Sequence, residues 1–351
     1  MSFPKALCLL CLLGTSLLRG AYPDRPEAQA FVQTMVEHHR FEAAALMELL
    51  KEVQPQEGAL QWVKPPASPV QKNWRVYRSR FIEPIRTKAG VAFWQQHRET
   101  LVRARQVYGV PEEIIVGILG VETIYGRNSG TFPVLDTLAT LAFDYPEAPN
   151  RVGRMALFLH ELEAYLLWCR ETGQDPHRWK GSYAGAMGLP QFLPSSIRAW
   201  AVDFDGDGRV DLQGSPADAI GSVAHYLQAH GWEAGRPVDA PVTGGVRSQR
   251  AAFLRADGDP EPRVALGELM KGGLKLQAPR AQDPKAQVLI VDLPSPGRRT
   301  LYRVGYRNFY VITRYNRSFF YASAVSDLGR AVKARLDRPR RVMMRHRSGK
   351  P

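Results

Sequence analysis

The chain has 351 residues, 44% of them hydrophobic and 23% charged, which is typical of a globular protein and excludes a disordered or fibrous class. This length accommodates two domains, or one large core with an attachment. The formal net charge is +13, and residues 337–351 hold a dense basic cluster without periodic apolar positions. Such a cluster is typical of a solvated tail. The alternative is a tail that holds an anionic polymer such as cell wall or lipopolysaccharide.

The first 21 residues predict a signal peptide. Lys5 precedes the apolar run ALCLLCLLGTSLL, which is short for a membrane span, and Gly20 and Ala21 offer a cleavage point. An uncleaved anchor is the alternative. Leucines precede Cys8 and Cys11, so we expect no lipid attachment and a periplasmic protein, for which nucleic acid is an unsuitable partner. Removal of this segment leaves one cysteine of three, so no intramolecular disulfide can form.

The next hundred residues predict helices around a linker. Residues 27–52 show helical spacing and indicate a small unit outside the main core. KPPASP at 64–69 is typical of a stiff, extended linker. WRVYRSRF at 74–81 alternates aromatic and basic residues, so it suits either an edge segment or one wall of a groove. Residues 91–107 predict an amphipathic helix.

The stretch GVPEEIIVGILGVETIYGRNSG at 109–130 is where we expect the chemistry. Pro111 begins a helix whose run 114–121 has no polar side chain, so the helix should be buried. Its two glycines each cost about 1 kcal/mol against Ala, which close approach of another backbone or a ligand would explain. Glu122 follows at the end of the helix, where desolvation would raise its pKa into the range of a general acid. The alternative is an acid that simply reaches solvent.

Two further helices, at 135–143 and 151–170, precede a segment of different character. GSYAGAMGLPQFLPSS at 181–196 is rich in glycine and proline, so it predicts a loop rather than a regular helix. Its few polar groups, Ser182, Tyr183 and Gln191, suit hydrogen bonding to a neutral ligand rich in hydroxyl groups. The alternative is a well-packed connector.

VDFDGDGRVDLQGSPAD at 202–218 resembles the start of a calcium loop, because carboxylates alternate along it and a glycine stands at the sixth position. These positions are Asp203, Asp205, Asp207 and Gly208. A consensus loop ends with Glu at the twelfth position, but this residue is Gly214, so Asp211 or Asp218 would have to close the shell. An acidic turn without metal is the alternative.

The last third of the chain changes composition and then returns to helix. Residues 218–231 predict a capped helix that ends in glycine. From residue 232 to 307 prolines and glycines are frequent, with short β-type runs at 287–293 and 300–304. NFYVITRYNRSFFY at 308–321 is dense in aromatic and polar side chains, and residues 322–336 predict a final helix.

Together, the blocks GVETIYGRNSG, GSYAGAMGLPQFLPSS and YVITRYNRSFFY resemble those of the B-type lytic murein transglycosylases of bacteria, in the same order, from about Phe31 to Leu336. The resemblance implies an α+β, predominantly α fold, with a core like that of goose-type lysozyme and a calcium loop. We therefore assign six regions: signal peptide 1–21, N-terminal helical unit and linker 22–73, catalytic core 74–231, small β-containing unit 232–307, return to the core 308–336 and basic tail 337–351.

Matching positions imply roles for individual residues. Glu122 occupies the place of the single catalytic acid. The positions that hold the sugar chain are Tyr77, Ser182, Gln191, Tyr226, Tyr315, Asn316 and Tyr321. The positions of the calcium site are Asp203, Asp205, Asp207, Arg209 and Asp218. The chain departs from the pattern in two places: Leu189-Pro190 replaces an expected Tyr-Gly, and one extra residue lies between Leu212 and Asp218.

The resemblance implies cleavage of the β-1,4 bond between N-acetylmuramic acid and N-acetylglucosamine without water, with a structural calcium ion and no organic cofactor. A hydrolytic glycosidase ordinarily needs two carboxylates, and Asp136 and Asp144 are the acids nearest to Glu122 in the chain. One carboxyl suffices if the sugar's own 6-hydroxyl is the nucleophile. A hydrolytic muramidase and a non-catalytic wall-binding protein are the alternatives. We expect a monomer that acts on glycan strands, with other cell-wall enzymes as candidate partners.

Overall fold

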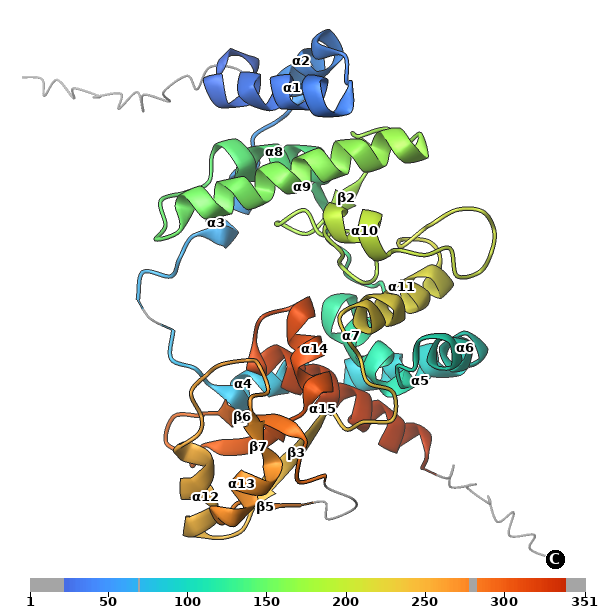
Figure 1. Ribbon diagram of the computed structural model, residues 1–351. Helices are drawn as coiled ribbons and strands as arrows, with labels where there is room; N and C mark the ends of the chain where they lie inside the picture. Colours follow the sequence, from blue (N-terminus) through green and yellow to red (C-terminus); the bar gives the residue numbers. More distant parts are fainter. Residues whose placement is uncertain (1–21, 69, 278–282, 339–351) are drawn as a thin grey trace, which may run out of the picture. The chain divides into compact units, whose positions relative to one another are not determined.

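The computed structural model describes residues 22–68, 70–277 and 283–338 (Figure 1). The predicted signal peptide lies outside these residues, as does the predicted basic tail from residue 339 onward. No helix within the described ranges is long and apolar enough to cross a membrane. The chain divides into a first unit that ends at Pro55 and a second that begins at Gln56.

The first unit is helical, as the spacing of residues 27–52 predicts. Its elements are the 3-10 turn η1 (Tyr22–Asp24) and the helices α1 (Pro26–His39) and α2 (Ala43–Glu52). Phe31 and Met35 of α1 and Leu46 and Leu50 of α2 are buried, so an apolar stripe on each helix forms the small core. Arg40 ends α1 in the left-handed conformation, with φ 58°.

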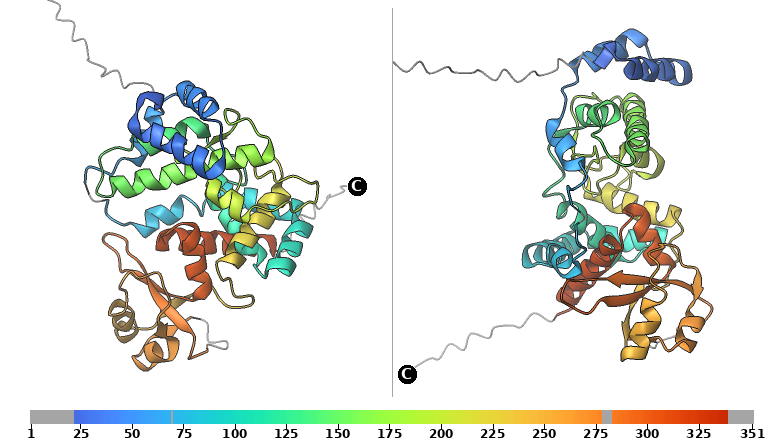
Figure 2. Two further views of the ribbon diagram at one scale, coloured as in Figure 1. Left: turned by 45° about the horizontal axis from the view of Figure 1, so that its top comes forward. Right: turned by 90° about the vertical axis from the view of Figure 1, so that its left-hand side faces the viewer.

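The second unit begins with helices that contain most of its core. They are α3 (Glu57–Val63), α4 (Trp74–Ser79), α5 (Pro84–Gln96), α6 (Arg98–Tyr108), α7 (Glu112–Thr123), α8 (Val134–Phe143), α9 (Arg151–Thr172), α10 (Pro194–Trp200) and α11 (Pro216–Ala229). Later in the chain follow α12 (Val246–Phe253), α13 (Leu266–Lys271), α14 (Arg307–Tyr315) and α15 (Phe319–Leu336). The long α9 runs alongside α8 in the views of Figures 1 and 2.

Four of these helices correct the sequence interpretation in three places. The segment 74–81 is no edge segment, because Trp74–Ser79 forms α4, whose first turn is capped by the side chain of Asn73. The single helix predicted at 91–107 is instead two, α5 and α6, which meet at His97. No proline or glycine explains that break, and we have no physical account of it. The predicted loop 181–196 ends three residues early, because Pro194 begins α10.

Helix α7 lies at the centre of the second unit, and every residue from Ile114 to Val121 is buried. Its glycines permit the close approach that the sequence predicts. A Cβ atom at Gly117 would collide with the backbone oxygen of Val325 in α15, and one at Gly120 would collide with the Tyr125 hydroxyl. The reverse also holds, since a Cβ atom at Gly329 of α15 would strike the backbone oxygen of Glu113. Helices α7 and α15 therefore pack backbone against backbone.

The β-containing unit forms one five-stranded sheet in the order β4-β6-β7-β3-β5, with every neighbouring pair antiparallel. Its strands are β3 (Asp239–Thr243), β4 (Val264–Ala265), β5 (Lys275–Leu276), β6 (Gln287–Leu293) and β7 (Leu301–Gly305). The β-type runs predicted at 287–293 and 300–304 are thus confirmed as β6 and β7. A separate pair of strands, β1 (Phe132–Pro133) and β2 (Lys180–Gly181), lies in the helical core.

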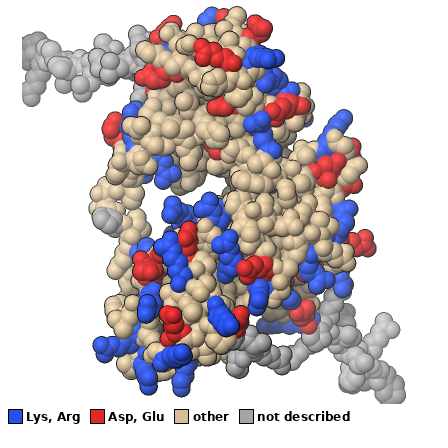
Figure 3. Space-filling view, viewed as in Figure 1, with Lys and Arg blue, Asp and Glu red and all other residues tan. Residues whose placement is uncertain are grey.

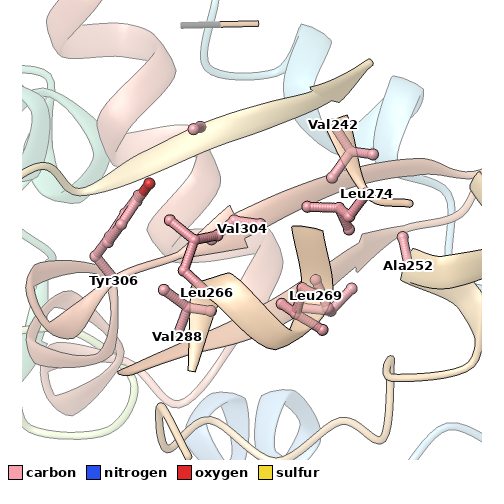
Figure 4. Close-up of a cluster of buried hydrophobic side chains, with 10 residues drawn as sticks. Val242, Ala252, Leu266, Leu269, Leu274, Val288, Val304 and Tyr306 are labelled. Atoms are coloured by element: carbon pink, nitrogen blue, oxygen red, sulfur yellow. The ribbon is translucent and has the colours of Figure 1, made fainter. Parts of the chain in front are cut away.

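This sheet has a hydrophobic core of its own (Figure 4). Val242, Val288 and Val304 of the strands contact Leu266 and Leu269 of α13, all of them buried. In both views of Figure 2 the strands lie together with α12 and α13. The β-containing unit, residues 232–307 and called the insertion below, therefore buries apolar side chains within itself rather than only against the helical core.

A cluster of ion pairs links the sheet to the helices. Asp239 of β3 and Asp327 of α15 have side chains that are 0% and 7% exposed, and both bind Arg303 of β7 at 2.8 and 2.9 Å. Arg330 also bridges the two carboxylates, at 2.6 and 2.8 Å. Arg78 of α4 binds Asp327 at 2.7 Å, and these cations hold the pKa of Asp327 at about 2 against the effect of burial.

Candidate active site

Glu122 lies in the last turn of α7, directly before a strained turn of the backbone. Ile124, Tyr125 and Gly126 all have positive φ, at 53°, 59° and 87°, a conformation that the first two residue types rarely adopt. The turn is held by Thr123, whose hydroxyl accepts from the Gly126 N–H at 2.9 Å. The chain thus reverses immediately after the carboxylate, and strain of this kind is commonly found at functional sites.

The electrostatics of Glu122 are those of a general acid. Its side chain is partly buried, and desolvation raises its pKa to about 7. The Tyr321 hydroxyl donates to Glu122 Oε1 at 2.5 Å, which favours the carboxylate and opposes part of that rise in pKa. Among the described residues, no second carboxylate is a cause of this shift. Glu122 is thus poised to hold or release a proton near neutral pH.

Three tyrosines surround this carboxylate. Burial raises the pKa of Tyr77, Tyr315 and Tyr321, and the charge of Glu122 raises each of them further. All three phenols therefore remain neutral over the physiological range. The Tyr315 and Tyr321 rings stack, with centroids 6.3 Å apart, and the Tyr77 ring packs edge-on against Phe320 at 5.4 Å. The sequence-predicted residues Tyr77, Tyr315 and Tyr321 are thus brought together around Glu122.

The glycine-rich loop between β2 and α10 is joined to the turn after Glu122. Gln191 donates from Nε2 to the backbone oxygens of Ser129 and Gly188, at 3.0 and 2.9 Å, and its own φ is 53°. The hydroxyl of Thr123, beside Glu122, donates to the backbone oxygen of Leu189 at 2.9 Å. The two motifs thus form one continuous wall, although about sixty residues separate them.

Ser182 lies in the same wall with its hydroxyl in use as an acceptor. Its Oγ accepts from the N–H groups of Ala184 and Ala186, at 3.2 and 3.1 Å. A serine hydroxyl has one proton to donate in addition, and none of its contacts within the described chain uses that proton. This proton is therefore available to an incoming acceptor.

The other two predicted sugar-binding residues lie in different environments. Tyr226 of α11 is buried, and its hydroxyl donates to the Arg314 backbone oxygen at 2.8 Å. Its ring packs edge-on against Tyr315, with centroids 5.0 Å apart, so it supports the wall from behind. Asn316 is exposed at the end of α14. Tyr226 thus contacts one of the tyrosines beside Glu122, whereas the sugar-binding role of Asn316 stays a prediction.

The departure at Leu189-Pro190 affects side chains but not the contacts made there. The Leu189 backbone oxygen accepts from Thr123, and the Pro190 backbone oxygen accepts from the Tyr315 hydroxyl at 2.5 Å. Any residue offers a backbone oxygen, so both bonds tolerate the replacement of an expected Tyr-Gly.

The sequence interpretation missed one aromatic pair. Trp62 of α3 stacks on Tyr183 of the glycine-rich loop, with centroids 5.7 Å apart and planes 23° apart. The two residues are 69% and 40% exposed, which is unusual for side chains of this size. Helix α3 follows the first helical unit, so nothing local to Trp62 indicated a partner 121 residues later.

The acidic loop brings three carboxylates together. Asp203, Asp205 and Asp218 each offer one oxygen, and these oxygens all lie within 4.8 Å of one another. Asp218 stands in the first turn of α11, and its two oxygens accept from the N–H groups of Phe204 and Asp211 at 2.7 Å each. Hard oxygen donors at this spacing suit calcium. The extra residue before Asp218 does not displace it from the group.

Asp207 is not one of these three. Its Oδ1 accepts from the Arg209 N–H at 2.9 Å, and its own N–H donates to Asp203 at 3.2 Å. Gly206 and Gly208 have φ of 82° and 86°, which glycine adopts without strain. The roles predicted for Asp207 and Arg209 stay predictions.

Comparison with known proteins agrees with this geometry. A family model described as a transglycosylase SLT domain matches residues 23–330. The chain is 42% identical over 322 residues to the membrane-bound lytic murein transglycosylase B of Escherichia coli, a match that covers 89% of this chain and 84% of the relative.

Solved structures of similar proteins have the same fold. Soluble lytic transglycosylase SltB1 of Pseudomonas aeruginosa superimposes with a TM-score of 0.79 at 43% identity, over 88% of this chain and 99% of that one. The lytic transglycosylase Slt35 of Escherichia coli gives 0.80 at 42% identity in complex with bulgecin A, over 91% and 96%. Its complex with calcium gives 0.77 at 41% identity, over the same shares. The chain belongs to the lytic murein transglycosylases with an SLT domain and a lysozyme-like core, lyases that cleave peptidoglycan.

Proposed function

We propose that Glu122 alone serves as acid and then as base in cleavage of the bond between N-acetylmuramic acid and N-acetylglucosamine. Neutral Glu122 protonates the glycosidic oxygen while the bond from that oxygen to C1 breaks. The Glu122 carboxylate then takes the proton of the muramic 6-hydroxyl as this oxygen bonds to C1. The product is a 1,6-anhydro sugar, Glu122 recovers its proton, and no water enters.

The observation that carries this proposal is the environment of Glu122. A pKa of about 7 lets one group give up a proton and regain it near neutral pH. No other carboxylate of the described chain perturbs it, whereas a hydrolase ordinarily places a second one within about 10 Å. Asp136 accepts from Gln56 Nε2 at 3.4 Å, and Asp144 is buried beyond the end of α8; neither is a cause of the pKa shift of Glu122.

We assign the walls around Glu122 to the sugar chain. The Tyr77 phenol and the free proton of Ser182 can donate hydrogen bonds to hydroxyl and acetamido groups without adding charge. The phenols of Tyr315 and Tyr321 already donate to Pro190 and Glu122, so their oxygens can accept from the sugar. Gln191 keeps the glycine-rich loop closed through its backbone contacts, and exposed Asn316 adds a further amide. Tyr226 contributes indirectly through its contact with Tyr315.

The exposed pair Trp62–Tyr183 extends this surface. Flat aromatic faces pack well against the apolar face of a sugar ring while leaving its hydroxyls in water. The stacking of the two rings holds them in one orientation before the substrate arrives, which lowers the entropy lost on binding. We assign this pair to a sugar of the strand some way from the bond that is cut.

We propose that the loop 203–218 holds a structural calcium ion. The three converging carboxylates support this assignment, as does a relative solved in complex with calcium. Asp207 and the Arg209 backbone oxygen would complete the shell after small movements. No organic cofactor is needed for the reaction above. The enzyme would act as a monomer in the periplasm, without a lipid anchor, on glycan strands and beside other wall enzymes.

Product analysis tests the mechanism. Purified sacculi are digested in oxygen-18 water, and the new chain ends are examined by mass spectrometry before and after borohydride treatment. We expect ends that are lighter than hydrolysed ends by one water, carry no label and resist reduction. Labelled, reducible muramic ends would instead identify a muramidase and refute the single-carboxylate mechanism.

A further inference from the structure

A cavity lies on the side of Tyr77 and the first turn of α15. Its volume is about 450 Å³, and it is lined by Lys72, Tyr77, Gly258, Pro260, Asp292, Thr313, Arg317, Ser318, Phe319 and Phe320. Pro260, Thr313 and Arg317 also border a second hollow of about 550 Å³. The two hollows therefore form one continuous depression between the helical core and the insertion.

Residues that line this cavity are direct neighbours in sequence of a residue that contacts Glu122. Phe319 and Phe320 in its wall directly precede Tyr321, whose hydroxyl donates to Glu122 at 2.5 Å. Tyr77 belongs to the cavity and also feels the charge of Glu122. A substituent on a sugar held at Glu122 would therefore reach the cavity without leaving the protein surface.

The cavity has a cationic character. Lys72 and Arg317 are exposed, and neither forms an ion pair with any acid in the described ranges. Arg263 in the adjoining hollow is different, because Asp259 and Glu261 both bind it at 2.7 Å. Figure 3 shows Lys and Arg side chains gathered below the gap in the centre of this face.

Neutral sugars offer no charged partner to Lys72 and Arg317, but the peptide part of the substrate carries carboxylates. One relative has been solved with two sugar fragments that carry a pentapeptide, and a free peptide end is a carboxylate. Guanidinium and ammonium groups are the usual partners of carboxylates. Asp292 is the one acid in the lining of the first cavity, so its two cations outnumber it.

We propose that this cavity binds the peptide stem of a muramic acid residue next to the scissile bond, with Lys72 and Arg317 as partners of its carboxylates. The inference rests on the proposed function, since it requires the sugar strand to lie at Glu122. It makes the insertion 232–307 part of substrate recognition, because Gly258, Pro260 and Asp292 supply one side of the cavity. Lys72 and Arg317 thus select stem-bearing strands rather than catalyse.

The test uses the double variant Lys72→Gln/Arg317→Gln of the full-length enzyme on three substrates. These are glycan strands with intact stems, strands whose stem carboxyls have been amidated, and strands from which an amidase has removed the stems. We expect kcat/KM to fall about three- to twentyfold on intact stems, the range for two exposed ion pairs. It should stay within about twofold on the amidated and stem-free strands.

A matched control separates local from general effects of charge. Lys88→Gln/Arg154→Gln removes the same two charges from exposed positions outside the cavity, and it should leave all three rates near those of the wild type. An equal fall of the test variant on all substrates, or no fall on intact stems, would overturn the proposal. Because the rate is followed as total soluble product, the comparison stays valid even if the ends prove to be hydrolysed, an outcome that refutes only the proposed mechanism.

Discussion

Replacing Tyr321 by Phe should move the pH dependence of the enzyme in a direction that the structure dictates. The wild type needs Glu122 protonated to cleave, so kcat/KM should be flat at low pH and fall above about pH 7, the pKa set by burial. The Tyr321 hydroxyl stabilises the carboxylate through a bond of 2.5 Å. Without that bond the carboxylate is less stable, and the pKa of Glu122 must rise.

The size of the shift follows from the type of bond. A hydrogen bond to a charged group contributes about 1.5–3 kcal/mol, and one pKa unit corresponds to about 1.4 kcal/mol. The descending limb of Tyr321→Phe should therefore lie about one to two units above that of the wild type. Part of the effect will be lost if water replaces the hydroxyl, so one unit is the firmer expectation.

The assay is kcat/KM on a defined glycan fragment between about pH 5 and pH 10. Tyr315→Phe is the matched control, because the Tyr315 hydroxyl donates to the Pro190 backbone oxygen rather than to Glu122. Its limb should stay at the wild-type position even if its rate falls. A limb of Tyr321→Phe that stays in place, or moves to lower pH, would refute the assignment of that limb to Glu122.

Four other changes have expected outcomes. Glu122→Gln should lower the release of soluble muropeptides by about 10²–10⁴-fold. Because folding raises the pKa of Glu122 from 4.5 to about 7, its charge has no effect on stability below pH 4.5, destabilises the fold increasingly between these values and does so fully above pH 7. Calorimetry should therefore find the variant more stable than the wild type by up to about 3 kcal/mol at pH 8 and equally stable below pH 4.5. Calcium should raise the melting temperature of the wild type by binding the folded loop, and Asp218→Asn should weaken that response without abolishing cleavage. Equal melting curves of the wild type with calcium and with chelator would refute the calcium assignment. Gly117→Ala should destabilise by about 1–3 kcal/mol in urea unfolding, because its Cβ collides with α15, whereas Gly173→Ala, with nothing near its Cβ, should suffer only from its positive φ. Trp62→Ala should raise KM for long strands about three- to tenfold with little change in kcat; an equal loss on a disaccharide-length substrate would contradict a distant sugar site.

The sequence predicted the parts of the site that depend on local pattern. An apolar run that ends in one carboxylate predicted a buried helix with a desolvated acid, and the structure places Glu122 there with a raised pKa. The glycines of that helix predicted a close approach, which Val325 of α15 supplies. The alternation of aspartates predicted an acidic cluster, and two of its members, Asp203 and Asp205, converge with Asp218. In each case spacing along one segment was sufficient.

Contacts between distant segments were beyond that kind of argument. Tyr321 lies 199 residues after Glu122, so only the resemblance to a family indicated a shared site, and it did not indicate the hydrogen bond. The stacked pair Trp62–Tyr183 was missed for the same reason. The break at His97 was missed because no local residue demands it.

The ion-pair cluster has a consequence for how the insertion is attached to the enzyme. Its entry and exit are adjacent, since Asp239 pairs with Gly305 across β3 and β7, and these two strands contribute Asp239 and Arg303 to the cluster. Excising the insertion would remove the anion Asp239 together with the cation Arg303. The remaining residues of the cluster, Asp327, Arg78 and Arg330, have the same net charge as the complete cluster. The insertion therefore contributes no net charge to the cluster and is attached to the core through two neighbouring strands. Exchanging it between relatives would alter the cavity beside Tyr77 while leaving no buried charge without a partner.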